Sequence, residues 1–88
     1  KAAVDNMTRS LARALAPAIR VFSVAPGLID TQFTGGWDAE QITRTAEMTP
    51  LGRIATCEDV ADAVLVAATH LRSTTGAVIP VDGGRPLL

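Results

Sequence analysis

Apolar side chains recur along the first sixteen residues at steps of three and four positions. They are Val4, Met7, Leu11 and Leu15, with charged residues between them. This spacing places them on one face of a helix and predicts an amphipathic helix over residues 1–16. Pro17 ends it, because proline lacks the backbone donor that the next turn needs.

Two short apolar runs have the composition of strands. Residues 20–25 form a run with two valines that closes at Pro26-Gly27, and residues 77–81 form a second run that closes at a turn, Asp82-Gly83-Gly84. Both predict buried strands followed by turns. Pro80 cannot donate a ladder hydrogen bond, so we expect the second strand at a sheet edge.

The segment between these strands is punctuated by glycine and proline over residues 28–55, with a weak helical stretch at 38–47. Thr56 then has the character of an N-cap, and the acids that follow suit the first turn of a helix. The apolar face expected for this last helix consists of Val60, Val64, Ala67, Ala68 and Leu71.

The order helix, strand, irregular segment, helix, strand predicts a fold. Two apolar strands joined through a helix favour a parallel sheet with helices on both faces, the doubly wound α/β class. Two strands do not make such a sheet alone, so the organisation predicts further strands. Lys1 opens directly into the helical pattern without a cap, and we expect the chain to be part of a longer domain.

Composition narrows the function. Aromatic residues are 3% of the chain and the net charge is −1, which disfavours a nucleic-acid partner. No apolar run approaches the ~20 residues of a membrane span. The single cysteine fits a reducing compartment, so we expect a cytoplasmic protein without membrane contact.

Few residues suggest chemistry on their own. The loop after Pro26-Gly27 follows the carboxyl end of a strand, where parallel sheets bind ligands, although for this loop alone a plain tight turn is the simpler interpretation. Asp59 and Asp62 share a helix face, but no histidine stands near them at metal-ligand spacing, so we expect no metal site. Cys57 and His70 have no visible catalytic partner.

Five sequence blocks, taken in their order along the chain, are more informative about the protein family than any single residue. They are the start at Lys1-Ala2-Ala3-Val4, the strand and loop of residues 19–31 (IRVFSVAPGLIDT), Pro50-Leu51-Gly52-Arg53, Glu58-Asp59-Val60-Ala61, and residues 75–84 (TGAVIPVDGG). In this order the chain resembles the short-chain dehydrogenase/reductase family over nearly all 88 residues, in the group that includes 3-oxoacyl-(acyl carrier protein) reductases. One departure is Phe22, where the family more often has asparagine or a small residue, and it bears on local packing.

The resemblance implies that residues 1–88 are the C-terminal part of a single NAD(P)-binding Rossmann-like domain and supply its last two strands. Lys1 matches the family's catalytic lysine, whose partner tyrosine would stand four positions upstream. That lysine favours the ionised phenol and also binds the nicotinamide ribose. The resemblance therefore implies hydride transfer between NAD or NADP and a ketone or alcohol.

The same resemblance implies further site residues. Pro26 and Gly27 would lie beside the nicotinamide, Ile29 would offer its backbone to the carboxamide, and Thr31 its hydroxyl. Residues 31–55 would be the variable substrate loop, a lid in many members. Its candidate substrate contacts are Phe33, Trp37 and Met48, which equally fit a role in packing the loop.

Assembly and alternatives follow from the comparison as well. Family members pair through the helix corresponding to residues 1–16 and through the last helix and strand, here about residues 57–81, so we expect a homotetramer or a homodimer. A non-catalytic binding or structural module derived from the family would have the same 88 residues. An independent small α/β domain is disfavoured by the capless start and the missing strands.

Overall fold

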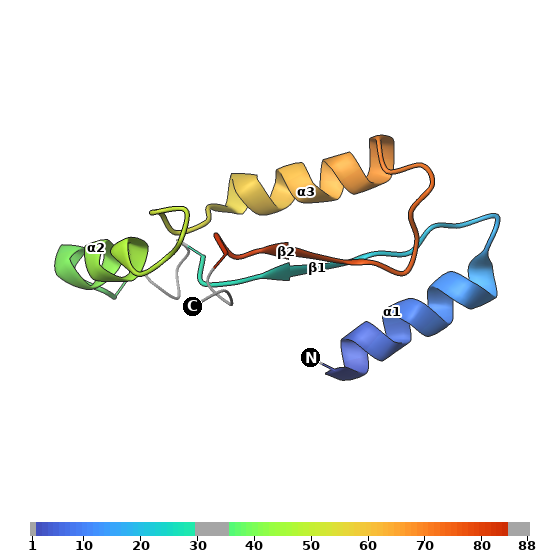
Figure 1. Cartoon of the computed structure of the whole chain (residues 1–88), viewed down its shortest axis with the longest axis horizontal. Coiled ribbons are helices and arrows are strands. Elements are labelled where there is room, and N and C mark those ends of the chain that lie inside the picture. The colour runs from blue at the N-terminus through green and yellow to red at the C-terminus, as the bar shows by residue number, and fades with distance from the viewer. Residues whose placement is uncertain (1, 30–35, 85–88) are drawn as a thin grey trace.

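The computed structural model describes residues 2–29 and 36–84. Its elements are α1 (Ala2–Leu15), β1 (Ser23–Pro26), α2 (Ala39–Glu47), α3 (Cys57–Thr69) and β2 (Val78–Val81), and Figure 1 shows their arrangement. Every element predicted from the sequence is present in the predicted order. The strands are shorter than predicted, because β1 begins three residues later than the apolar run and β2 begins one residue later.

β1 and β2 pair in parallel, in the register that runs from Ser23 opposite Val78 to Pro26 opposite Val81. The backbone N–H of Ser23 donates to the carbonyl of Ala77, and that of Gly27 donates to the carbonyl of Val81, both at 3.0 Å. In a parallel pair, the backbone N–H and C=O of every second residue point toward the partner strand. The nitrogen of Pro80 belongs to the other set and points away from β1. Within the described residues β2 pairs only with β1; both strands of a two-stranded sheet are edges, so the edge position of β2 stays a prediction.

The helices lie on both sides of the strands. α3 covers one face and contacts both strands, and α1 lies against the other face, next to β1 (Figure 1). β1 returns to β2 through α2 and α3, which is the crossover that parallel strands require. The layers are therefore those of a doubly wound α/β sheet, as the sequence predicted.

α1 contacts the sheet through small side chains and not through its apolar stripe. Thr8 and Ala12 are its buried residues, and the hydroxyl of Thr8 lies 2.9 Å from that of Ser23 in β1. The stripe predicted from the sequence is 39–55% exposed; its members are Val4, Met7, Leu11 and Leu15. Short side chains let the helix axis approach the strand closely, which turns the larger apolar residues outward.

The face of α3 differs from the prediction in two positions. Ala67 is buried and Val60, Ala63 and Leu71 are half-buried, whereas Val64 is 52% exposed and Ala68 is exposed too. Ala63 is half-buried although it was not predicted on this face, and Val64 lines an open cavity beside β1 together with Phe22 and Val24. Steps of three and four residues are both compatible with one face, so periodicity alone did not distinguish these neighbours.

Arg20 joins the start of the β1 segment to the end of α3. Its guanidinium donates hydrogen bonds to the carbonyls of Ala67 and Leu71, both at 2.7 Å, and to that of Ala68 at 3.0 Å. These carbonyls belong to the last turn of α3 and the residues after it, where a cation is favoured. The same guanidinium lies 5.6 Å from the ring centroid of Phe22, so this unusual aromatic residue packs under the arginine.

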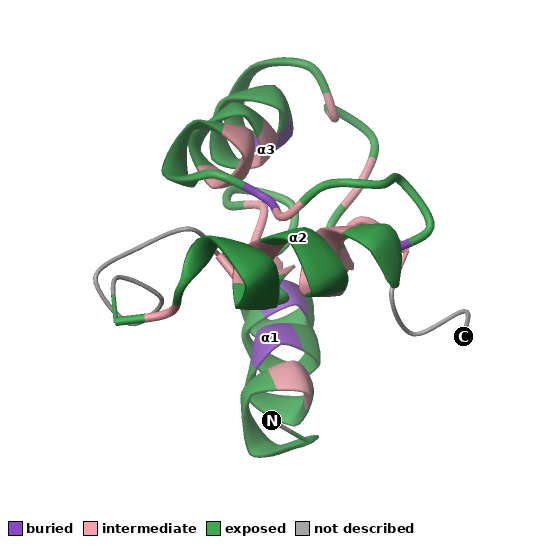
Figure 2. Ribbon diagram, turned by 90° about the vertical axis from the view of Figure 1, so that its left-hand side faces the viewer, coloured by how far each residue is buried: buried purple, intermediate pink, exposed green. Residues whose placement is uncertain are grey.

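The core is small. Among the described residues only Ala12, Ala55 and Ala67 are buried apolar residues. Figure 2 shows the buried parts of the chain as a few isolated purple segments. The strands predicted to be buried are half-buried, with an exposed residue in each. The radius of gyration is 15.2 Å, against ~12 Å for a compact domain of this length. The described elements therefore form one part of a layered sheet domain and do not enclose a core of their own.

Candidate functional site

The carboxyl ends of β1 and β2 lie side by side. Pro26 is opposite Val81, and Gly27 and Asp82 follow them directly. A Cβ atom built on Gly27 would lie 2.8 Å from the Cβ of Asp82, which is closer than real Cβ atoms approach one another. Glycine at position 27 therefore lets the loop after β1 pass directly against the end of β2, at the edge where parallel sheets bind ligands.

The start of α1 lies at the same end of the sheet. From the contact between Thr8 and Ser23, six residues back along the helix to Ala2 span ~9 Å. Three residues forward along β1 to Pro26 span ~10 Å. α1 and β1 run in opposite directions, so going back along α1 and forward along β1 leads toward the same end of the sheet (Figure 1). The first described turn of α1 and the Pro26-Gly27 loop thus lie at about the same level.

A parallel bridge between Ile29 and Ala55 closes the base of the excursion that follows β1. Ala55 is buried, with 8% of its surface exposed. The bridge fixes the backbone of Ile29, one of the predicted cofactor contacts, against the residue that precedes the cap of α3. The two ends of the predicted substrate loop consequently meet beside the carboxyl edge.

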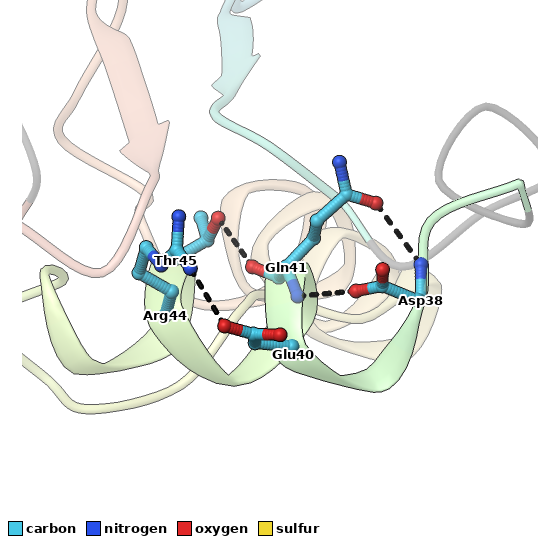
Figure 3. Close-up of polar contacts among 5 residues, drawn as sticks. All are labelled: Asp38, Glu40, Gln41, Arg44 and Thr45. Carbon is cyan, nitrogen blue, oxygen red and sulfur yellow. Dashed lines mark hydrogen bonds and ion pairs between the residues drawn. The ribbon is translucent and has the colours of Figure 1, made fainter.

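α2 is stabilised by its own polar contacts. Asp38 is its N-cap: its carboxylate accepts from the backbone N–H of Gln41 at 2.8 Å, and the Gln41 side chain accepts from the N–H of Asp38 at 3.0 Å (Figure 3). Arg44 and Glu40 form an exposed ion pair at 2.8 Å. Because α2 lies beyond the ends of both strands, this short helix stands over the carboxyl edge (Figure 1).

Two of the predicted substrate contacts flank α2. Trp37 precedes the N-cap and is half-buried, whereas Met48 is the C-cap and is 56% exposed. The structure brings Pro26, Gly27 and Ile29 together at the carboxyl edge. The other predicted site residues, Lys1, Thr31 and Phe33, lie outside the described residues.

The turn after β2 has a role that the sequence analysis missed. Gly83 and Gly84 have φ angles of 66° and 85°, which L-residues rarely adopt, and the carboxylate of Asp82 accepts from the N–H of Gly84 at 2.9 Å. The carbonyl of Gly83 accepts from the N–H of Leu51 at 3.0 Å. The Asp-Gly-Gly sequence signalled a turn, but not that the end of the excursion docks on it.

The acids near α3 serve the helix. The guanidinium of Arg53 donates to both oxygens of Asp59, at 2.8 and 3.1 Å, and Asp59 forms a capping box with Thr56. The hydrogen bonds from Arg53, followed by that from the Thr56 backbone, hold the pKa of the Asp59 carboxyl well below its usual range. No group of three or more potential metal ligands gathers within residues 2–29 and 36–84.

Two cavities bear on the site. The smaller, about 300 Å³, lies beside the turn after β2; its lining includes Leu51, Arg53, Asp59 and the residues from Pro80 to Gly84. The larger, about 720 Å³, lies between α3 and the segment that leads into β1, and includes Ile19, Phe22 and Val64. The larger cavity lies away from the carboxyl ends of the strands, beside the segment that leads into β1, whereas the smaller one borders the turn that follows β2. We therefore place the candidate site at the carboxyl edge.

Residues 1–85 match the sequence profile of a family described as enoyl-(acyl carrier protein) reductase. The chain belongs to the short-chain dehydrogenase/reductase family. It is 50% identical over 88 residues to a protein of Streptomyces violaceoruber named as ketoacyl reductase 2 of the granaticin polyketide synthase, with 92% of this chain and 33% of that protein covered. It is 43% identical to a 3-oxoacyl-(acyl carrier protein) reductase of Aquifex aeolicus, with 96% and 35% covered.

The fold of this family member is also seen in solved structures. A small-chain dehydrogenase in complex with NADPH superimposes with a TM-score of 0.85 at 38% identity, over 99% of this chain and 41% of that one. The chain thus spans about a third of the length of the curated relatives described above. No helix in the described part of the chain is long and apolar enough to cross a membrane.

Proposed function

We propose that this chain is the C-terminal part of an NAD(P)-dependent oxidoreductase that transfers hydride between the cofactor and a carbonyl or alcohol substrate. Membership in the short-chain dehydrogenase/reductase family supports this proposal, as does the similarity to a dehydrogenase that binds NADPH. When bound, the nicotinamide supplies or accepts the hydride, and the chain's own residues bind, orient and protect it.

One geometric observation carries the proposal: the first turn of α1 and the Pro26-Gly27 loop lie at the same level, at the carboxyl edge of the sheet. Lys1 stands directly before α1 in the sequence. A lysine there would hold a positive charge beside the bound nicotinamide ribose and favour the ionised form of a neighbouring tyrosine. That phenol would exchange the proton with the substrate oxygen.

The loop after β1 fits a nicotinamide. Its backbone is held at both ends of the Gly27–Ile29 stretch, by the N–H of Gly27 on Val81 and by the bridge from Ile29 to Ala55. We propose that Pro26 and Gly27 border the ring, and that Ile29 and Thr31 bind the carboxamide. A rigid backbone in this place keeps one face of the ring toward the substrate.

Residues 31–55 are proposed as the substrate loop. The exposure of Met48 at the end of α2 supports a role in substrate contact, and Trp37 and Phe33 are proposed beside it. Closing such a loop would exclude water from the hydride-transfer site. The substrates that fit this proposal are ketones and secondary alcohols.

The full-length protein is proposed to form a homotetramer or a homodimer. Large apolar residues of α1 and α3 are exposed on the described surface, and exposed apolar patches mark interaction sites. They are Val4, Met7, Leu11 and Leu15 of α1 with Val64, Leu65 and Val66 of α3. A cytoplasmic location belongs to the same proposal, because the one cysteine fits a reducing compartment.

The test uses full-length protein with a panel of ketones and alcohols, each assayed with NADH and NADPH or their oxidised forms. Turnover of at least one ketone, measured as loss of reduced cofactor, is the expected result, together with a tyrosine four positions before Lys1. Absence of that tyrosine together with absence of turnover would instead favour a non-catalytic binding or structural module. The 88-residue chain alone is expected to be inactive.

A further inference from the structure

Gly83 lies between two parts of the proposed site. It belongs to the turn that ends β2, and its φ angle of 66° is held by neighbours on both sides. Asp82 before it is the residue against which Gly27 packs, and the carboxylate of Asp82 fixes the N–H of Gly84. The position of Gly83 is therefore set by the same turn that borders the cofactor loop.

On its other side Gly83 meets the segment that leaves α2, residues 49–53, here called the α2 junction. A Cβ on Gly83 would lie 2.5 Å from the Cγ2 of Thr49, 3.4 Å from the carbonyl oxygen of Arg53 and 3.9 Å from the Cβ of Leu51. The N–H of Leu51 donates to the carbonyl of Gly83 at 3.0 Å. Only a residue without a side chain leaves room for this approach.

Thr49 transmits the contact to α2. Its side chain is buried, with 7% of the residue exposed, and its hydroxyl donates to the carbonyl of Thr45 at 2.8 Å. Its backbone N–H donates to the carbonyl of Ala46 at 3.1 Å, so Thr49 continues the last turn of α2. Met48, a proposed substrate contact, is its direct neighbour in the chain.

The junction has no large apolar anchor at this point. The side chain of Leu51 is 73% exposed, so the methyl group of Thr49 and one backbone hydrogen bond make the contact with Gly83. A shift of Gly83 or Thr49 would move the end of α2 relative to the Pro26-Gly27 loop.

We propose that Gly83 is a positioning residue, which sets the distance between the substrate-binding end of α2 and the cofactor loop through its contact with Thr49. The inference rests on the proposed function, because it names what holds the two halves of that site together. It predicts that a small steric change at Gly83 affects substrate use more than cofactor binding or stability.

The experiment is a double-mutant cycle in the full-length protein: Gly83→Ala, Thr49→Ser and the two combined. Thr49→Ser removes only the methyl group and keeps the hydroxyl that bonds to Thr45. The added Cβ of Gly83→Ala needs the space that this methyl occupies. Gly76→Ala is the matched control, because Gly76 also has a positive φ, 75°, lies before β2 outside the proposed site, and a Cβ there comes no closer than 3.4 Å, to the Cβ of Ala12.

The readouts are KM for the ketone, the Kd of the reduced cofactor, Tm, and hydrogen exchange at the Leu51 amide. We expect Gly83→Ala to lower kcat/KM by ~10- to 100-fold through KM, as for a displacement near 1 Å. Cofactor Kd should change little. Thr49→Ser should also raise KM, by a smaller factor than Gly83→Ala. The double variant should recover most of the kcat/KM that Gly83→Ala loses.

Several results would overturn the inference. Equal losses in Gly83→Ala and Gly76→Ala would assign the effect to backbone strain. Failure of Thr49→Ser to restore Gly83→Ala would exclude the steric contact. If Gly83→Ala does not fold, an unchanged KM and unchanged Leu51 exchange in Thr49→Ser would contradict the proposal. A wild-type protein without turnover would contradict the proposed function alone, while Leu51 exchange that is equal in all variants would contradict this inference alone.

Discussion

Gly27 and Asp82 pack against each other across the carboxyl ends of the two strands, so closely that a methyl group on Gly27 has no room. The added Cβ would lie 2.8 Å from the Cβ and 3.1 Å from the Cα of Asp82. Both atoms are tied to the backbone of the turn after β2 and do not swing aside. The loop after β1 is therefore held in place by its neighbour and by its own lack of a side chain.

Gly27→Ala is expected to displace this loop and to weaken cofactor binding by ~10-fold or more in Kd, since a displacement near 1 Å disturbs several contacts at once. Fluorescence titration of full-length protein with NADH or NADPH measures the effect. Gly36→Ala is the control, because a Cβ at Gly36 meets nothing within 4 Å. Equal cofactor affinities for the two variants would show that Gly27 does not contribute to cofactor binding.

Lys1→Ala is expected to lower kcat by ~100-fold or more, the scale on which proton transfer contributes to catalysis. Tm should change little, and cofactor affinity should fall as well. Lys1→Arg keeps the positive charge but alters its reach, so it should retain part of the activity. If Lys1→Ala left both kcat and cofactor affinity unchanged, the assignment of this lysine would be wrong.

Arg20→Met is expected to destabilise the folded protein by ~1–3 kcal/mol, because it removes charge-assisted hydrogen bonds to the end of α3. Denaturant unfolding of the full-length protein measures the change. Arg20→Lys should lose less, since one ammonium replaces part of the bonding. Arg72→Met, an exposed arginine that lines the same cavity, should stay within about 0.5 kcal/mol of wild type.

The ion pair between Arg53 and Asp59 predicts a pH dependence of stability. The pKa of Asp59 is lowered in the folded state, so its stabilising effect is complete above the unfolded value of ~3.9 and is lost as the pH falls through the folded value. Asp59→Asn should therefore lower Tm at neutral pH, and the difference from wild type should shrink below pH ~4. Asp62→Asn, which removes a carboxylate from the exposed side of the same helix, is the control.

Leu11→Glu is expected to reduce the oligomeric mass of the full-length protein in size-exclusion chromatography with light scattering. Leu11 is 42% exposed in the apolar stripe of α1, and a buried carboxylate in an interface is costly. Ser10→Glu changes the polar side of the same helix and should leave the mass unchanged. An unaltered mass in both variants would place the subunit contacts elsewhere.

The spacing of apolar residues and the positions of proline, glycine and capping residues determined which elements form and in what order. Pro17 ends α1 near the predicted residue, Thr56 caps α3 as predicted, and the order of strands and helices gave the parallel α/β class. Five ordered blocks identified the family. These features are local or follow from chain order, so no knowledge of distant contacts was needed.

Only the tertiary structure decided which of two adjacent residues faces the sheet. Thr8 packs against Ser23 of β1, whereas its neighbour Met7 and the rest of the α1 stripe are exposed, because close helix–strand approach selects small side chains over large ones. The same holds for Gly83 against Thr49. Gly83 and Thr49 are far apart in the sequence. The lack of space for a side chain at position 83 arises only once β2 and the end of α2 have come together.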